Sequence, residues 1–257
     1  MKVTEYYPIN ILKPFVKVIK IIECGDGEIQ NRVLPNTSLS MAFCIIGQNS
    51  YTMDSGNFIL PKSVISGLRK SVRLINYSKN TSTIIVLFNE NGAGAFFKVP
   101  LHRLFEESIS LDNIVNPSEI RDTEELLCGA KTNFQRVKII EQFLLNNLIN
   151  RKPDTLISDA VAKIHQANGN IRMSKLADLH YISSDAFEKR FRKNIGSSPK
   201  QFASIVRMFS IISQKENRRI LGIALDAGFY DQAHFNNNFK LFTGQTPTEF
   251  YKTGTFW

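Results

Sequence analysis

The sequence predicts an α+β domain over residues 1–150, followed by an all-α domain over residues 151–257. Three observations predict this division. Short β-branched and aromatic runs separated by turn residues occupy the first part, whereas helical periodicity dominates after residue 154. A set of apolar and helix-capping positions in the second part also recurs at a constant spacing. The polar break at residues 151–154 therefore marks the predicted domain boundary.

The positive charge of the chain is concentrated in its second part. The 257 residues carry a formal net charge of +9. Residues 1–150 hold 16 Lys and Arg against 14 Asp and Glu (+2), while residues 151–257 hold 16 against 9 (+7). This asymmetry favours a polyanion as partner of the second domain. No apolar run approaches the roughly 20 residues of a membrane span and no secretory leader is recognisable, so we expect a cytoplasmic protein without a membrane partner.

The first domain is predicted to contain several short strands. Runs at residues 15–22, 39–46, 57–60 and 83–88 are rich in β-branched and aromatic residues and are separated by Gly, Asn, Ser and Pro clusters. Strands at this spacing predict a small β-barrel or sandwich, of the cupin-like kind. The three cysteines are widely spaced and are expected to be buried, reduced thiols; they are Cys24, Cys44 and Cys128.

Two helices are predicted to complete the first domain. Asn116-Pro117 can start one that runs to about Cys128, and Thr132 can cap another that runs to about Asn150. The positions predicted on one face of this second helix are Phe134, Val137, Ile140 (or Glu141), Leu144 and Leu148. The cluster of Leu144, Leu145 and Leu148 can either pack on its own domain, which we favour, or pair with a second copy in a homodimer.

The second domain is predicted to be helical throughout. Helices are expected around residues 157–164, after a Ser174 cap, after a cap at Ser183 or Ser184, and from Pro199 to about Gln214. Beyond residue 221 the pattern is a short helix, a turn at Gly228, and a second helix capped by Asp231. Two short helices joined by a glycine turn are the pattern of a DNA-reading helix-turn-helix.

This pattern occurs twice in the chain. Six positions at core or cap sites match others 48 residues later: Phe187 and Phe235, Phe191 and Phe239, Gly196 and Gly244, Ser198 and Thr246, Pro199 and Pro247, Phe202 and Phe250. The second domain is therefore predicted to hold two helix-turn-helix units, at about 155–197 and 217–252, joined by a helix over residues 199–214. The second helices, about 184–193 and 232–242, would have to lie about 34 Å apart to enter successive major grooves.

At this point the chain resembles a known family. The residues Ile223-Ala224, Gly228-Phe229, Phe235, Phe239-Lys240, Gly244 and Thr246-Pro247 match the signature of AraC/XylS-type bacterial transcriptional regulators. The resemblance covers about residues 155–252. Leu34-Pro35, Gly92 to Phe97, Pro100 and Leu111 also resemble the sensor domain of one branch. The resemblance implies double-stranded DNA as the partner, a small-molecule effector for the sensor domain, and RNA polymerase as a further partner if the protein activates transcription.

The resemblance also implies which side chains contact DNA. The solvent face of each second helix would read bases, through Ser184, Asp185, Glu188 and Lys189 in the first unit and Gln232, Ala233, Asn236 and Asn237 in the second. Gln and Asn can bond bidentately to adenine. Candidates for phosphate contacts are Arg172, Arg192, Lys200, Arg218, Arg219 and His234; the adjacent Arg218 and Arg219 could equally be a solvated charge pair. Asn237 and Lys189 stand where Arg is frequent in the family, so we expect an A·T-leaning second half-site.

A cupin-like metal enzyme fused to a helical module is the competing hypothesis. Such an enzyme needs several histidines and a carboxylate converging inside the barrel, and the first 150 residues hold a single histidine, His102. No HxH, GxSxG or GxxxxGK[ST] motif occurs, and the glycine-rich segment 91–95 lacks a following lysine. The sequence therefore predicts no catalytic residues, no bound metal and no cofactor.

Overall fold

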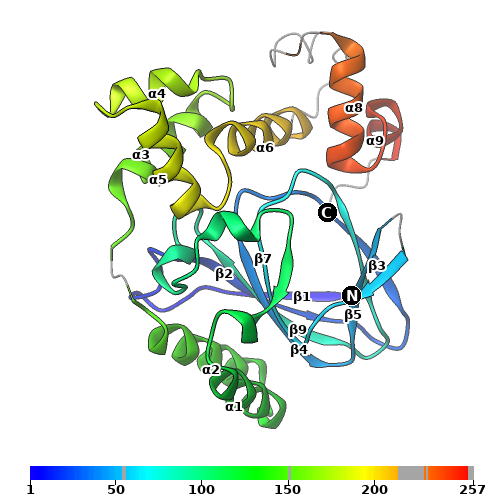
Figure 1. The fold of residues 1–257 in the computed structure, drawn as a ribbon. Coiled ribbons are helices and arrows are strands. Elements are labelled where there is room, and N and C mark those ends of the chain that lie inside the picture. The colour runs from blue at the N-terminus through cyan, green and yellow to red at the C-terminus, as the bar shows by residue number, and fades with distance from the viewer. Residues whose placement is uncertain (54–55, 150–151, 214–228, 230, 254–257) are drawn as a thin grey trace.

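The computed structural model describes residues 1–53, 56–149, 152–213, 229 and 231–253. A strand-rich N-terminal domain lies below a helical C-terminal domain, as predicted (Figure 1). The helices α1 (Pro117–Gly129) and α2 (Asn133–Asn146) lie at the opposite end of the sheets. The strands are β1 (Lys2–Tyr6), β2 (Val16–Glu23), β3 (Ile29–Val33), β4 (Ser40–Ile46), β5 (Asn49–Met53), β6 (Gly56–Ile59), β7 (Ser63–Ser66), β8 (Arg73–Tyr77), β9 (Ser82–Phe88) and β10 (Ser108–Ser110).

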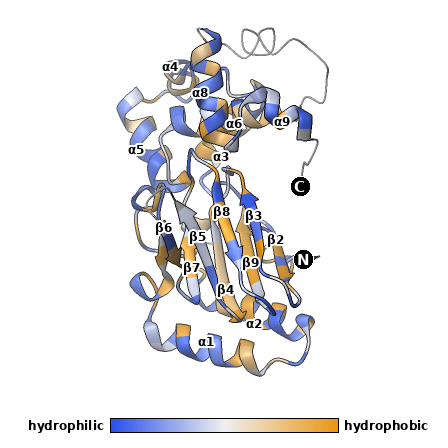
Figure 2. Cartoon of the chain, turned by 90° about the vertical axis from the view of Figure 1, so that its right-hand side faces the viewer, coloured by the Kyte–Doolittle hydropathy of each residue, from blue (hydrophilic) through white to orange (hydrophobic). Residues whose placement is uncertain are grey.

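These strands form two antiparallel sheets rather than a closed barrel. The larger sheet has the order β1-β2-β9-β4-β7-β10, and the smaller one has the order β3-β8-β5-β6. In Figure 2 the two sheets overlap, with the helical domain at one end and α1 and α2 at the other. The strands predicted at 15–22, 39–46, 57–60 and 83–88 correspond to β2, β4, β6 and β9.

The larger sheet has two chemically different faces. On β4, Met41, Phe43 and Ile45 point to the main core, and Phe43 meets Phe143 of α2 at a ring-centroid distance of 5.7 Å. The alternate residues of β4, beginning with Ser40, point toward the smaller sheet and are only half-buried. The side of the sheet that faces α1 and α2 is therefore a packed apolar core, while the side between the sheets is lined by smaller and more polar residues.

The two helices of the N-terminal domain begin where their caps predict. Asn116 caps α1 (Pro117–Gly129), and Thr132 forms a capping box with Gln135 at the start of α2 (Asn133–Asn146). Helix α2 ends before the predicted Asn150, because Asn147 is its C-cap and donates its side-chain amide to the Phe143 carbonyl at 3.0 Å.

The predicted apolar face of α2 is wrong at Phe134. This side chain is 63% exposed, because it lies in the first turn, where the Nζ of Lys138 covers its ring at 5.5 Å. Leu144 is fully buried, and Leu145 and Leu148 pack against the same core from partly buried positions. The leucine cluster thus contacts its own domain. Of the three free cysteines, Cys24 is buried as predicted, but Cys44 is half-buried and Cys128 on α1 is exposed.

The C-terminal domain contains α3 (Thr155–Gln166), α4 (Met173–Leu179), α5 (Ser184–Ile195), α6 (Pro199–Ile212), α8 (Gln232–Thr243) and α9 (Pro247–Thr253). The predicted first helix of the second unit, including Ile223, Ala224 and Gly228, lies outside the described residues. Ser174 is not a helix cap as predicted: α4 begins one residue earlier, at Met173, with Arg172 in the cap position and no side-chain hydrogen bond there.

The internal repeat is reproduced in the aromatic core. The rings of Phe187 and Phe191 pack in a tilted arrangement with their centroids 5.7 Å apart, and Phe191 meets Phe202 of α6 at a centroid distance of 5.6 Å. In the second unit, Phe239 takes the place of Phe191, at 5.6 Å from Phe235 and 5.3 Å from Phe250 of α9. Each of the repeated phenylalanines is a core residue, as predicted, rather than a platform for stacking bases.

Glycine 169 fixes the approach of α3 to the linking helix α6. It has a φ of +74°, and a Cβ atom at this position would lie 2.2 Å from the carbonyl oxygen of Ala203. The carbonyl group of Gly169 itself accepts a hydrogen bond from the Arg207 side chain of α6 at 3.1 Å. Only glycine can therefore sit here without displacing α6.

Candidate nucleic-acid interface

The first predicted recognition helix, α5, begins and ends at strong capping residues. The Ser183 hydroxyl accepts a hydrogen bond from the Ala186 amide at 3.2 Å, and Gly196 closes the helix with a φ of +91°. Phe187, Phe191 and Ile195 anchor one side of the helix in the core. The rest of its circumference is free to carry polar side chains.

The predicted base-reading residues of α5 do not all share one environment. Ser184, Asp185 and Glu188 are exposed to solvent. Lys189 is exposed too, but it borders a groove of about 850 Å³ between α5 and the N-terminal domain, lined on the other side by residues 97–100. Lys189 therefore lies at the edge between the predicted reading face and the domain interface.

Arg192, the predicted phosphate contact on α5, is paired within the helix. Its Nε lies 2.8 Å from the Glu188 carboxylate, one turn away, and both side chains are about half exposed. Exposed pairs at this spacing contribute only about 0.3–0.5 kcal/mol. Arg192 can therefore leave Glu188 to bind a phosphate, and Glu188 can leave Arg192 to bind a base, at little cost in stability.

The second predicted recognition helix, α8, has the same construction. Asp231 accepts a hydrogen bond from the His234 amide at 2.7 Å, and Gly244 ends the helix with a φ of +77°. Gln232, Ala233 and Asn237 are exposed, and Asn236 is half-buried, so the predicted reading face is polar and uncharged. The exposed His234 packs its ring on Phe229 at 5.5 Å, which fixes it beside this face.

The remaining predicted phosphate contacts are spread around the two units. Arg172 at the start of α4 and Lys200 in the first turn of α6 are both exposed, as a phosphate contact requires. Arg218 and Arg219 lie outside the described residues. Within the described ranges, no group of three His, Cys, Asp or Glu side chains could hold a metal ion, and no helix is long and apolar enough to cross a membrane.

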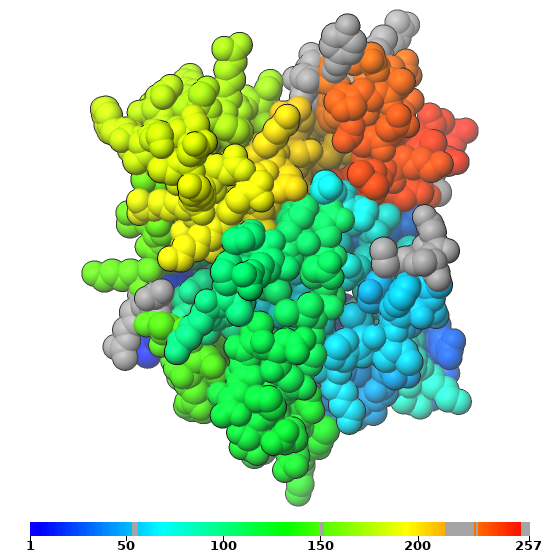
Figure 3. Space-filling view, viewed as in Figure 1, coloured from blue at the N-terminus to red at the C-terminus, as the bar shows by residue number. Residues whose placement is uncertain are grey.

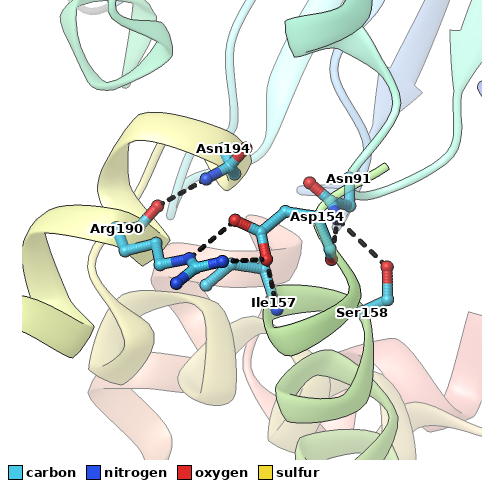
Figure 4. Close-up of polar contacts among 6 residues, drawn as sticks. All are labelled: Asn91, Asp154, Ile157, Ser158, Arg190 and Asn194. Carbon is cyan, nitrogen blue, oxygen red and sulfur yellow. Dashed lines mark hydrogen bonds and ion pairs between the residues drawn. The ribbon is translucent and has the colours of Figure 1, made fainter. Parts of the chain in front are cut away.

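A polar latch between the domains was not predicted. Asp154, directly after the predicted boundary, accepts hydrogen bonds from Arg190 of α5 at 2.7 Å (Nε) and 3.0 Å (Nη2), and it caps α3 through the Ile157 amide at 3.2 Å (Figure 4). The Asp154 carbonyl accepts from Asn91 of the N-terminal domain at 2.8 Å. The first recognition helix is thereby tied to the strand-rich domain.

The charge balance of this latch stabilises the ionised carboxylate. Partial burial acts to raise the pKa of Asp154, but the hydrogen bonds from Arg190 and the Ile157 amide outweigh it, so the pKa lies below its ordinary value. The same hydrogen bond raises the pKa of Arg190. No local sequence pattern could have identified this pair, because 36 residues separate its members.

A second contact joins the N-terminal domain to α8. The Val72 amide, in the turn before β8, donates to the Leu241 carbonyl near the end of α8 at 3.1 Å. A Cβ atom on Gly244 would lie 3.1 Å from the Cγ1 of Val72. In Figure 3 the orange α8 rests on the cyan segment around residue 70. Both predicted recognition helices therefore contact the N-terminal domain.

Comparison with known protein families assigns both parts of the chain. Residues 176–253 match the family model of a helix-turn-helix domain, and residues 4–110 match that of a domain of unknown function, DUF6597. Together with the internal repeat, the first match shows that the chain carries a helix-turn-helix domain, as its resemblance to the AraC/XylS-type regulators implies.

Two curated relatives are bacterial regulators. The chain is 29% identical over 117 residues to an uncharacterized HTH-type transcriptional regulator of Haemophilus influenzae, covering 45% of this chain and 38% of that protein. It is 26% identical over 155 residues to the Msm operon regulatory protein of Streptococcus mutans, covering 58% and 55%. The matches thus span about half or less of each relative's length.

Among solved structures, ToxT from Vibrio cholerae O395 is similar over 95% of this chain and 100% of that chain, at 14% identity and a TM-score of 0.44. The C-terminal domain of AraT, a response regulator from Geobacillus stearothermophilus, is similar over 40% of this chain and 89% of that domain, at 18% identity and a TM-score of 0.37.

Proposed function

We propose that this protein is a sequence-specific, double-stranded DNA-binding transcriptional regulator in the cytoplasm, with residues 1–150 as sensor or assembly domain and residues 151–257 as DNA-binding domain. The observation that carries the proposal is the repeat of one recognition-helix design. In α5 and α8, a capped N-terminus, two buried phenylalanines and a left-handed glycine leave one polar face exposed. This is how a helix-turn-helix presents side chains to the major groove.

The two helices are proposed to read DNA in different ways. On α8, Gln232 and Asn236 offer the amide pairs that recognise adenine, and no charged side chain lies among the four predicted readers. On α5, Glu188 and Asp185 can accept from cytosine, while Lys189 and Arg192 supply positive charge. Non-specific affinity would then come from basic residues around the reading faces and fall steeply with salt concentration.

For the N-terminal domain we propose a sensory role. A space between its two sheets, lined by small and polar residues, supports a small-molecule effector. ToxT, one of the similar structures, is described with an unsaturated fatty acid bound. A homodimer stays a prediction, since the leucines considered for it pack within their own domain. RNA polymerase is a partner only if the protein activates transcription.

Selection from random DNA tests the proposal. Purified full-length protein should enrich a site with two half-sites whose centres lie about 10 base pairs apart, one for each helix. The double variant Q232A/N236A should lose the sequence preference of one half-site and keep that of the other. A matched control, Lys175→Ala on the exposed side of α4, should enrich the same site as the natural protein. Recovery of no preferred sequence by the natural protein would refute the proposal.

A further inference from the structure

The space between the two sheets is a cavity of about 110 Å³. It exists because the inward-facing residues of the larger sheet are small: Ser40, Ala42 and Cys44 follow one another on β4 where a sandwich core would have large apolar side chains. The residues between the sheets that do form an apolar cluster are few, centred on Ile22, Cys24 and Tyr77. The two sheets are therefore not closely packed against each other, and a cavity remains between them.

Two arginines line one end of this cavity. Arg69 follows β7, and its Nη2 donates to the carbonyls of Val33 and Leu34 at 3.1 and 3.3 Å. Its Nε is buried and has no hydrogen-bond partner among the described residues. Arg73 begins β8, donates from Nη1 to the Ser108 hydroxyl at 2.5 Å, and stacks over the Tyr51 ring at 4.5 Å. Both guanidinium groups are held in place by neutral partners.

Neither cation forms an ion pair among the described residues. Glu106 and Glu107 act on them only from beyond ion-pair distance, and the Glu106 carboxylate accepts a hydrogen bond from the Lys70 amide at 3.1 Å. Burial, reinforced by the charge of Arg73, lowers the pKa of Arg69 to about 10, so it is still cationic at neutral pH. Two neighbouring, partly buried charges of the same sign are costly unless an anion lies close to both.

Hydroxyl groups also line this end of the cavity. Strand register places Ser40, Ser66 and Ser108 side by side on β4, β7 and β10, and the last two hydroxyls are 2.7 Å apart. Beyond them the walls become apolar, with Val64, Ile75 and Ile85. The cavity thus has a cationic, hydroxyl-rich end and an apolar body, which matches a molecule with an anionic head and a short hydrocarbon part.

We propose that this cavity binds a small organic carboxylate, with the carboxylate at Arg69 and Arg73 and the hydrocarbon part against Ile75 and Ile85. The inference rests on the sensory role proposed above and specifies its ligand class. Guanidinium groups bind carboxylates through paired, charge-assisted hydrogen bonds. A cavity of about 150 Å³ can hold benzene, so the 110 Å³ here restricts the ligand to a short-chain carboxylate.

The same segment connects the cavity to the second recognition helix. Val72 stands between the two arginines in sequence, and its amide is the group that donates to Leu241 of α8. Its side chain faces Gly244 at the end of that helix. An anion that draws Arg69 and Arg73 together acts on a turn already bonded to α8. Ligand binding should therefore change the affinity for DNA, by about fivefold or more for a typical coupling.

Calorimetric titration of full-length protein tests the proposal, with butyrate, its neutral isostere butyramide, and inorganic phosphate as ligands. We expect butyrate to bind and butyramide and phosphate to bind at least about tenfold more weakly. Arg69→Gln and Arg73→Gln should each weaken butyrate binding about tenfold or more. Arg103→Gln is the matched control, since Arg103 is exposed and does not line the cavity, and it should leave binding unchanged.

Further variants keep the result interpretable if an arginine variant is unstable. Ile85→Phe fills the cavity without touching either arginine and should also abolish butyrate binding. Equal binding of butyrate and butyramide, equal binding of phosphate, or unchanged butyrate affinity in Arg69→Gln would each overturn the proposal. DNA binding is measured in parallel: a protein that selects its DNA site but binds no carboxylate refutes this inference alone, and a protein that binds butyrate but selects no DNA sequence refutes the proposed function.

Discussion

Replacing Arg190 by Gln should loosen the tie between the first recognition helix and the N-terminal domain. The substitution removes both hydrogen bonds from Arg190 to the Asp154 carboxylate, at 2.7 and 3.0 Å. It leaves a side chain that is only 17% exposed, with backbone amides at the start of α3, including that of Ile157, as its remaining donors. Asp154→Asn is the complementary change, because asparagine caps helices as well as aspartate and so removes the charge without removing the cap of α3.

The expected magnitude follows from the exposure of the pair. Exposed ion pairs contribute about 0.2–1 kcal/mol. This pair is bidentate and one partner is mostly buried, so the upper end of the range applies. Each single variant should therefore lower the free energy of unfolding by about 1 kcal/mol, and the double variant should cost little more than either one, which gives a coupling energy of about 0.5–1 kcal/mol.

Urea denaturation of the four proteins in this cycle measures the coupling. If the two single losses in unfolding free energy add up to that of the double variant, with a coupling below about 0.3 kcal/mol, Arg190 and Asp154 do not stabilise the protein as a pair. The dependence on pH provides a second check. Because the folded-state pKa of Asp154 is depressed, its contribution is complete above the ordinary value of about 3.9 and is lost as the pH falls through the lower folded-state pKa. The coupling should thus be constant between pH 5 and 8 and vanish in stronger acid.

Three further predictions concern the two units. Asn236→Ala should reduce discrimination at one base pair by about 1–3 kcal/mol, measured by titrating single-base variants of the selected site, whereas equal losses on all sequences would argue against base reading. Arg192→Gln should weaken binding to every sequence and lower the slope of log affinity against log salt by about 0.9, and a changed preferred sequence would show that Arg192 reads bases. Gly169→Ala should destabilise the protein by about 1–3 kcal/mol in thermal or urea unfolding, while the control Gly129→Ala, which meets no atom within 4 Å, should not.

Much of the helical domain could be predicted because its signals are local. The phenylalanines of α5 and α8 recur at helical spacing, and their helices end at glycines with positive φ. The Ser198-Pro199 pair starts α6 with a capping box that includes Gln201, three residues away. Each of these features is decided by residues within one or two turns of each other, so a single sequence is sufficient to locate them.

The strand-rich domain was predicted less completely. Strands such as β8, with the sequence RLINY, are too polar and too short for their periodicity to stand out, yet they form because neighbouring strands pair with them. Periodicity predicts the exposed Phe134 on the buried face of α2, because periodicity does not show where a helix leaves the sheet it covers. Tertiary context decides both cases.

The interdomain contacts could not be predicted at all. Asn91 and Asp154 lie 63 residues apart, and Val72 and Leu241 meet through backbone atoms that carry no sequence signal. Arg69 and Arg73 likewise look like ordinary surface charges in the sequence, because their burial results from the way the two sheets face each other. Residues that connect domains are therefore the part of the site that only the structure reveals.

The central claim is that one chain reads two successive major grooves with α5 and α8. The most direct measurement is the affinity for the selected site before and after insertion of five base pairs between its half-sites. Such an insertion turns the second half-site to the opposite side of the duplex. The affinity of the natural protein should fall to that for a single half-site. On the altered DNA, the Q232A/N236A variant should then bind no more weakly than the natural protein. Unchanged affinity after the insertion would contradict the claim.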